Sequence, residues 1–150
     1  MESHHNGRPW VVTFHNAQML GILQALYEDA LEFAKERVVC GKPIIQHDTV
    51  KLMLADMRMK LEAARALIYK TAWKLQYQPE DRKYNSELVY LAKAFVDEIG
   101  LTIMRDADEI HGAPGTNKDT LTEKLIRDAF TMLHWMHTRQ ISYLKGAPTI

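Results

Sequence analysis

The chain has 150 residues, 47% hydrophobic and 25% charged, values that suit one ordinary globular domain with a buried core. Its 19 lysines and arginines balance 19 aspartates and glutamates, so the net charge gives no reason to expect nucleic acid or an anionic membrane surface as a partner. No apolar run reaches the ~20 residues of a membrane span, and one cysteine excludes an internal disulfide and fits a reducing compartment.

The first helix is predicted after a polar start. Residues 1–9 are interpreted as a flexible lead-in or a cloning remnant, ahead of a domain at residues 10–150. Apolar residues then recur every three or four positions without a convincing alternating strand, which predicts helices. The first helix is expected from about Pro9 to Val38, until glycine and proline in residues 40–43 end it. Its apolar stripe is Phe14, Ala17, Gly21, Gln24, Tyr27, Leu31 and Ala34.

Three further helices follow, with Asp48 as the expected N-cap of the second. The second stripe is Val50, Met53, Met57, Leu61, Ala64, Ile68, Thr71 and Leu75, and the third is Leu88, Leu91, Phe95, Ile99, Thr102 and Ile110. The fourth begins near residue 119, carries Leu121, Leu125, Ala129, Leu133 and Met136, and can extend through Ile141 and Leu144. Four long helices with short connections predict an all-α, up-down-up-down four-helix bundle, and apolar area left exposed favours further association.

No metal site is expected. A di-iron site in such a bundle needs Glu-x-x-His pairs on facing helices, and the only segment with this spacing, Glu2 to His5, lies in the lead-in. His134 and His137 are one helical turn apart, but no carboxylate at helical spacing orients them, so bonding to backbone or water is the favoured interpretation. Cys40 follows a helix C-terminus, where the helix dipole disfavours a thiolate, and is expected to be inert.

Several longer motifs occur in a fixed order. They read LGI at 20–22, YEDALEFAKER at 27–37, CGKPIIQH at 40–47, LADM at 54–57, EAAR at 62–65, EIHGAPG at 109–115, EKLIRDA at 123–129 and WMHTRQI at 135–141. This series resembles the acyl-CoA dehydrogenase family, whose corresponding patterns include A-L-x-Y-A-x-E-R-x-x-F-G-x-P-I, Q-I-H-G-G-x-G, E-x-L-x-R-D-A and Y-E-G-T-x-x-I. The resemblance covers about residues 10–145.

The resemblance implies the C-terminal helical domain, or a separate small subunit, of an FAD-dependent enzyme that dehydrogenates acyl-CoA thioesters between the α and β carbons. Family members carry two further domains ahead of this bundle, and the flavin ring lies between one of them and the bundle. We therefore expect FAD to bind only with a partner chain or in a full-length protein. An acyl-CoA thioester and a homo- or hetero-oligomer are the expected partners. The expected location is the cytoplasm, or the mitochondrial matrix in a eukaryote.

The base that the resemblance requires is missing. The family's proton-abstracting glutamate corresponds to Met136, whose thioether cannot accept a proton. Some members carry that glutamate on the first helix instead, at a position that falls at about Val11. The backbone N–H of Met136 can still donate to a thioester carbonyl, as it does in the family. His137, which replaces a glycine, is the nearest alternative base, so whether this chain is itself an enzyme stays open, and it is not expected to be catalytic alone.

The cofactor contacts implied by the resemblance are partly retained. Arg37 matches an arginine that reaches the flavin diphosphate of a neighbouring subunit, with a guanidinium suited to phosphate. Cys40 stands where a phenylalanine packs on the cofactor, and Glu109 replaces a glutamine that contacts the diphosphate. Ala113 replaces a glycine at which the backbone approaches the cofactor, followed by Pro114, which has no N–H to offer.

Three matching positions are unchanged: Gly115, Thr138 and Gln140, the last two corresponding to residues that help to hold adenosine and diphosphate. These residues and Arg37 favour a flavoprotein component. The alternative is a degenerate bundle without flavin that acts in oligomerisation or protein interaction. It is favoured by the substitutions at Cys40, Glu109, Ala113 and Pro114.

Overall fold

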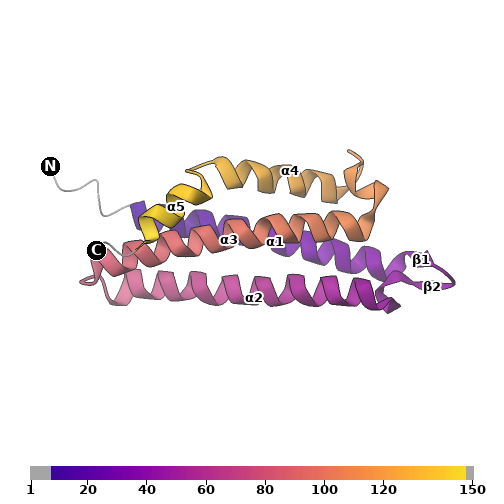
Figure 1. Cartoon of the computed structure of the whole chain (residues 1–150), viewed down its shortest axis with the longest axis horizontal. Coiled ribbons are helices and arrows are strands. Elements are labelled where there is room, and N and C mark those ends of the chain that lie inside the picture. The colour runs from indigo at the N-terminus through magenta and orange to yellow at the C-terminus, as the bar shows by residue number, and fades with distance from the viewer. Residues whose placement is uncertain (1–7, 148–150) are drawn as a thin grey trace.

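A computed structural model describes residues 8–147 as an elongated helical bundle. Its elements are α1 (Arg8–Glu36), β1 (Val38–Val39), β2 (Lys42–Pro43), the 3-10 turn η1 (Ile44–Gln46), α2 (Asp48–Tyr77), α3 (Arg82–His111), the 3-10 turn η2 (Ala113–Thr116), α4 (Leu121–His134) and α5 (Arg139–Gly146). The long helices run alternately along one axis, with α4 and α5 on the side away from α2 (Figure 1). This confirms the all-α class and the up-down-up-down order.

The connection between α1 and α2 contains a small hairpin that the sequence analysis did not predict. Helix α1 ends at Glu36, and Val38 and Val39 then pair antiparallel with Pro43 and Lys42. The start of α1 at Arg8 places residues 8 and 9 in the helix rather than in the lead-in, and residues 1–7 lie outside the described chain.

The first half of the predicted stripe of α1 lies on the wrong face, although its last residue, Ala34, is buried as predicted. Phe14 is 63% exposed and Ala17 and Gly21 are exposed, whereas the buried apolar face is Val12, Met19, Leu20, Leu23, Leu26, Ala30 and Ala34. Helix α1 contacts α2, α3 and α4, and apolar residues occur around much of its circumference. The spacing of apolar residues therefore fits more than one face, and packing against three helices decides between them.

Helix α2 follows its predicted stripe, with Met57, Leu61, Ala64, Ile68 and Thr71 buried. Its predicted N-cap is wrong, because His47 occupies the cap position without a side-chain hydrogen bond and Asp48 is the first helical residue. Helix α3 approaches α1 so closely at Gly100 that a Cβ there would lie 2.7 Å from Cε of Met19. The core between these helices is therefore packed at van der Waals distance around a small residue.

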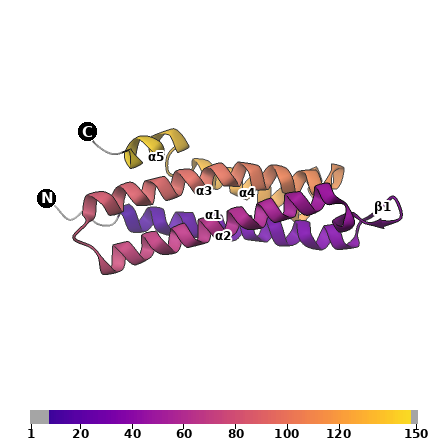
Figure 2. The same cartoon turned by 60° about the horizontal axis from the view of Figure 1, so that its bottom comes forward.

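The fourth predicted helix is two helices. Helix α4 buries Leu125, Ala129 and Leu133 as predicted, but the chain leaves it after His134 and begins α5 at Arg139. The turned view shows α5 standing off from α4 and lying along the first half of α3 (Figure 2). The break allows Gly146 to pack on α3, where a Cβ would lie 2.6 Å from Cγ of Leu91. None of the helices in residues 8–147 is both long and apolar enough to span a membrane.

Candidate functional site

The hairpin and the end of α3 enclose the first hollow that contains residues selected from the sequence. This hairpin hollow has a volume of about 480 Å³, within the range of small-molecule sites. It is lined by Phe33, Arg37, Val39, Cys40, Ile44, His47, Val50, Met53, Glu109, Ile110, His111 and Gly112. Three residues expected to contact the cofactor thus share this hollow: Arg37 just before β1, Cys40 in the hairpin loop and Glu109 near the end of α3.

Backbone hydrogen bonds hold the hairpin over the end of α1. The amide of Ile44 donates to the carbonyl of Arg37 at 2.8 Å, and the amide of Arg37 donates to that of Phe33 at 2.9 Å. Nε2 of His47 lies 3.2 Å from the carbonyl oxygen of Val39, which ties the start of α2 to the hairpin. The backbone of Arg37 is therefore held on both sides by hydrogen bonds, to Phe33 and to Ile44. His47 was not selected from the sequence, although it belongs to the motif at 40–47.

His111 forms a fixed wall of the hairpin hollow. Its Nδ1 donates to the carbonyl of Ala107 at 2.8 Å, since a carbonyl can only accept. Its Nε2 lies 3.0 Å from Oγ1 of Thr122 and 3.2 Å from Oδ2 of Asp29, and its ring stacks on Phe33 with centroids 4.4 Å apart. Side chains from α1, α3 and α4 are joined at this histidine, so the end of α3 is held in place.

The polar groups of the hairpin hollow are of opposite sign. Arg37 and Glu109 are both exposed, and neither makes an ion pair with another residue in the described part of the chain. An Arg guanidinium can donate two parallel hydrogen bonds to a phosphate, while a carboxylate beside a phosphate is repulsive. The hollow can therefore attract an anionic ligand on one side only.

The glycine motif after α3 divides into an open part and a packed part. Gly112 has φ 64 and lines the hollow, and a Cβ there would meet nothing within 4 Å, so its backbone is open to a ligand. Ala113 and Pro114 are exposed in η2. Gly115 is buried, and a Cβ there would lie 2.6 Å from Oδ1 of Asp108 and 3.1 Å from Cβ of His111. Gly115 thus faces the protein, and Gly112, which was not selected from the sequence, is the glycine that faces the hollow.

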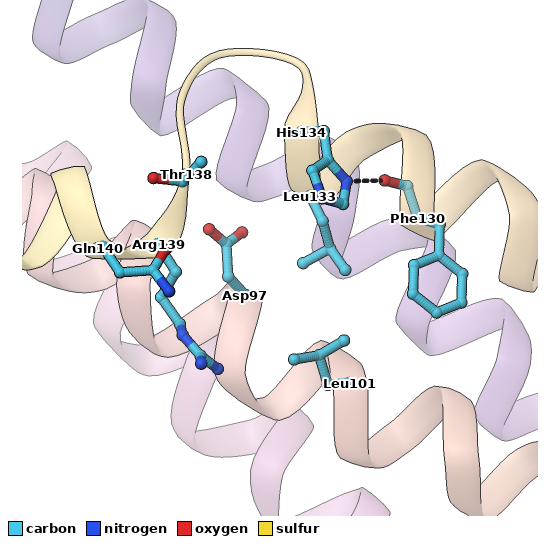
Figure 3. Close-up of a pocket in the computed structure, with 8 residues that line it drawn as sticks. All are labelled: Asp97, Leu101, Phe130, Leu133, His134, Thr138, Arg139 and Gln140. Carbon is cyan, nitrogen blue, oxygen red and sulfur yellow. Dashed lines mark hydrogen bonds between the residues drawn. The ribbon is translucent and has the colours of Figure 1, made fainter.

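Thr138 and Gln140 lie at a second hollow, between α3, α4 and the start of α5, here named the α5 hollow (Figure 3). Its volume is about 180 Å³, below the usual range of ligand pockets. It is lined by Asp97, Leu101, Phe130, Leu133, His134, Thr138, Arg139 and Gln140. Because α3 rises 1.5 Å per residue, Asp97 and Glu109 are about 18 Å apart along the helix, so the two hollows are separate places on this chain.

Polar contacts hold the α5 hollow together. Arg139 pairs with Glu98, and Nδ1 of His134 donates to the carbonyl of Phe130 at 2.9 Å (Figure 3). The latter bond confirms the interpretation of His134 as a backbone-bonded histidine. Asp97 is buried, and its Oδ2 accepts from Nζ of Lys93 at 2.6 Å. Its Oδ1 has no partner in the described part of the chain, and burial raises the pKa of this carboxyl.

Met136, where the resemblance leads us to expect the family's base, is part of the hydrophobic packing. It is half-buried against the cluster of Val12, Val89 and Tyr90. Val11, at about the alternative position expected for that base, is 49% exposed on α1. Met136 lies outside the helices, and its amide donates no hydrogen bond to a backbone carbonyl of residues 8–147. The structure thus offers a free N–H here and no carboxylate.

Two histidines lie near this segment: His137, next to Met136 in the chain, and His15, whose ring contacts that of Trp135. The ring of His137 is 5.4 Å from that of Tyr90, its Nε2 has no partner among the described residues, and burial followed by the charge of Lys145 lowers its pKa. His15 is 1% exposed, and burial lowers its pKa to about 4. A lowered pKa makes an imidazole a weaker base, so the environment of neither ring favours proton abstraction. His15 was missed because its face of α1 was expected to point away from the core. Within residues 8–147 no three His, Cys, Asp or Glu side chains are grouped to hold a metal.

Comparison with known proteins links this geometry to one family. The family model described as acyl-CoA dehydrogenase, C-terminal domain, matches residues 7–142. The chain is 34% identical over 128 residues to the 3-(aryl)acrylate reductase of Clostridium sporogenes, covering 85% of this chain and 33% of that protein. It is 35% identical over 113 residues to the short-chain specific acyl-CoA dehydrogenase of Megasphaera elsdenii, covering 75% of this chain and 28% of that protein. The chain therefore spans about a third of the length of these relatives.

Solved structures of related proteins share the helical fold of this chain. The butyryl-CoA dehydrogenase of Megasphaera elsdenii superposes with a TM-score of 0.82 at 30% identity, over 90% of this chain and 34% of that one. The FAD complex of PigA superposes with a TM-score of 0.79 at 25% identity, over 88% of this chain and 33% of that one.

Proposed function

Because the chain belongs to the acyl-CoA dehydrogenase family, through that family's C-terminal domain, we propose that it is the C-terminal part, or a separate small subunit, of an FAD-dependent oxidoreductase acting on acyl-CoA thioesters. It contributes one wall of the flavin and acyl-CoA site and contacts to the rest of the assembly. The observation that carries the proposal is the hairpin hollow, which gathers Arg37, Cys40 and Glu109 beside the open backbone of Gly112.

The residues present fit a flavin dinucleotide in part. Arg37 supports binding of a diphosphate, because its guanidinium is exposed at the hollow and free of ion pairs with the other described residues. Glu109 opposes it, because its carboxylate lines the same hollow. Thr138 and Gln140 can hold polar groups of a dinucleotide only at the α5 hollow, about 18 Å away along α3. We therefore infer that one chain contributes to two dinucleotide sites, each completed by other polypeptide.

This chain's role in the reaction is to bind and polarise rather than to remove a proton. When bound, FAD supplies the acceptor for a hydride from the acyl group. The free amide of Met136 can donate to a thioester carbonyl, which favours negative charge on that oxygen. No carboxylate stands at Met136 or Val11, so the base comes from His137 or from another chain, or catalysis is absent.

FAD titration of the chain together with the polypeptide that co-purifies with it tests the proposal, with flavin fluorescence as the readout. We expect Arg37→Gln to weaken binding about tenfold or more, since hydrogen bonds to charged groups contribute about 1.5–3 kcal/mol. Glu109→Gln should strengthen binding by removing the repulsion. Arg58→Gln is the matched control, because Arg58 is an exposed arginine of α2 that lines neither hollow.

A protein that stays colourless, and whose spectrum is unchanged by FAD alone or with the polypeptide that co-purifies with it, would contradict a flavin role. That result would favour the alternative, a bundle acting in oligomerisation or protein interaction. One observation supports this alternative: large apolar side chains are exposed along α2, at Leu52, Met59, Tyr69, Trp73 and Tyr77. Sedimentation analysis would then show an assembly that forms without flavin.

A further inference from the structure

The outer side of α2 carries an apolar surface of its own, opposite the face that α2 buries in the bundle. Helix α2 lies at the edge away from α4 and α5, and no other helix of the described chain covers its outer side (Figure 1, Figure 2). Its large apolar side chains there are exposed by 51–71%: Leu52, Met59, Tyr69, Trp73 and Tyr77. Three exposed alanines lie between them, Ala55, Ala63 and Ala66. These eight residues are here named the α2 stripe.

The α2 stripe follows the seven-residue repeat of helices that pair with other helices. Four of its residues are spaced by seven, which places them at the a positions of a heptad repeat: Leu52, Met59, Ala66 and Trp73. The d positions, three residues further along in each heptad, are Ala55, Glu62, Tyr69 and Gln76. Polar residues at such positions lower the stability of a pair but help to specify its register. The stripe therefore indicates that a second helix packs along α2.

Two copies of the α2 stripe complement each other when the two helices run antiparallel. Centred on residue 64, an antiparallel alignment brings a positions opposite d positions, so Trp73 of one copy faces Ala55 of the other, and Met59 faces Tyr69. A large side chain then meets a small one, and a thioether meets an aromatic ring, which is a favourable contact. A parallel alignment would place Trp73 against Trp73 and Ala66 against Ala66, which leaves the second layer underpacked.

The charges of α2 also favour two antiparallel copies. Its acidic residues all lie in the first half of the helix: Asp48, Asp56 and Glu62. The second half carries Lys70 and Lys74, and Lys70 is exposed and forms no ion pair within residues 8–147. An antiparallel pair brings Lys70 of one copy beside Asp56 of the other, which also pairs with Lys60 of its own chain. A parallel pair would bring the lysines together, and its helix dipoles would repel.

The α2 stripe is large enough for a stable dimer. Five large side chains that are half to three-quarters exposed present roughly 700 Å² per copy, close to the ~800 Å² that each partner buries in a standard interface. The alanines between them allow two helix axes to approach to the usual distance of about 8–10 Å. An apolar patch of this size marks an interaction site rather than an ordinary solvated face.

We propose that the α2 stripe is the interface of a symmetric dimer, in which α2 packs antiparallel against α2 of a second copy of this chain with the two-fold axis beside residue 64. This inference deepens the proposed function by identifying one contact of its assembly, and that role of the dimer rests on the proposed function. The stripe includes none of the residues that line the hairpin hollow or the α5 hollow, so the dimer can be measured without flavin.

Sedimentation velocity of the full chain over a range of concentrations, without FAD, tests the interface. We expect a dimer, and Met59→Glu should weaken dimer formation about tenfold or more, because a carboxylate facing Tyr69 of the second copy loses hydration. Leu144→Glu is the matched control, since Leu144 is an apolar residue of α5 that is 77% exposed and the charge changes equally. A chain that is monomeric at every concentration overturns the proposal, and so does an assembly that Met59→Glu leaves unchanged or that Leu144→Glu weakens equally.

Distances between spin labels test the antiparallel alignment. One label is attached through Lys51→Cys or Arg58→Cys, both exposed positions of α2, in a chain whose single cysteine is removed by Cys40→Ser. Because a helix rises 1.5 Å per residue, antiparallel pairing about residue 64 predicts separations along the helix of about 39 Å at position 51 and about 18 Å at position 58. Equal separations at the two positions indicate a parallel pair and overturn the proposal.

The same measurements separate a second copy from other occupants of the stripe. A heavier particle without any distance between labels would show that a different polypeptide covers α2, which also overturns the proposal. A colourless dimer with the expected distances would support this interface although the flavin role fails. A yellow monomer would support the flavin role and overturn the interface, so the two proposals fail independently.

Discussion

The rings of His15 and Trp135 lie with their centroids 5.5 Å apart, and this contact packs the segment that carries Met136 against α1. Among residues 8–147, neither ring nitrogen of His15 has a hydrogen-bond partner, and neither polar atom of the neighbouring Asn16 side chain has one. The segment between α4 and α5 thus covers polar groups that water would otherwise solvate, so protonation of His15 here is opposed by burial.

Acidification should destabilise the protein through His15. Burial, then Lys93 and to a smaller extent His137, lower the pKa of His15 from 6.5 to about 4. Because the unfolded chain binds this proton near pH 6.5 and the folded chain only near pH 4, stability is highest above about pH 6.5 and falls toward pH 4, by on the order of 3 kcal/mol. Urea unfolding at a series of pH values measures this slope.

The variant His15→Leu should flatten that slope, while His134→Gln, at an exposed histidine, should keep it. The lowered pKa of His137 acts in the same direction as that of His15. The raised pKa of Asp97 acts in the opposite direction, because the folded state binds that proton more readily. An unchanged slope in His15→Leu would show that another group causes the acid sensitivity.

Restoring the family's glutamate at Met136 should cost stability. Met136 packs against Val12, Val89 and Tyr90. A carboxylate in this partly buried, apolar environment would lose part of its hydration without gaining a hydrogen bond from these three residues. We expect Met136→Glu to lower the free energy of unfolding by about 1–3 kcal/mol, and Met136→Leu by less than about 1.5 kcal/mol. Urea unfolding of both variants checks this, and equal stability would mean that the side chain at 136 can turn to solvent.

Two glycines should respond oppositely to alanine. A Cβ at Gly115 would lie 2.6 Å from Oδ1 of Asp108, so Gly115→Ala should destabilise the protein by about 1–3 kcal/mol. A Cβ at Gly21, within α1, would meet nothing within 4 Å, so Gly21→Ala should stabilise it by about 0.5–1 kcal/mol. Thermal unfolding distinguishes them. A harmless Gly115→Ala would indicate that η2 can shift away from Asp108.

The hairpin should become more stable when Cys40 is replaced by asparagine. Cys40 and Gly41 form the two-residue loop between β1 and β2, with φ of 53 and 78, and this type of turn favours Asn-Gly. We expect Cys40→Asn to raise the free energy of unfolding by roughly 0.5–1 kcal/mol, and Cys40→Val to lower it, because β-branched residues resist positive φ. Differential scanning calorimetry of the pair measures both signs.

The sequence pattern predicted the buried face correctly for some helices and not for others. The stripe of α2 identified its buried face because α2 has one apolar side, with Met57, Leu61 and Ala64 on it. The stripe of α1 did not, because α1 is surrounded by three helices and its polar residues do not mark a solvent side. No proline or glycine marks the break between α4 and α5, and beyond it Gly146 packs closely on Leu91 of α3, a contact that no local pattern indicates.

The sequence by itself determined the family, the helical class and the absence of a carboxylate at Met136, because these depend on which residues occur and in what order. Only the tertiary structure decided that Arg37 shares a hollow with Glu109 while Thr138 and Gln140 lie at another, and that Gly112 rather than Gly115 is open. The physical reason is that close packing of α1, α3 and the segments after them determines which side chains meet, and no local pattern records contacts between residues distant in sequence.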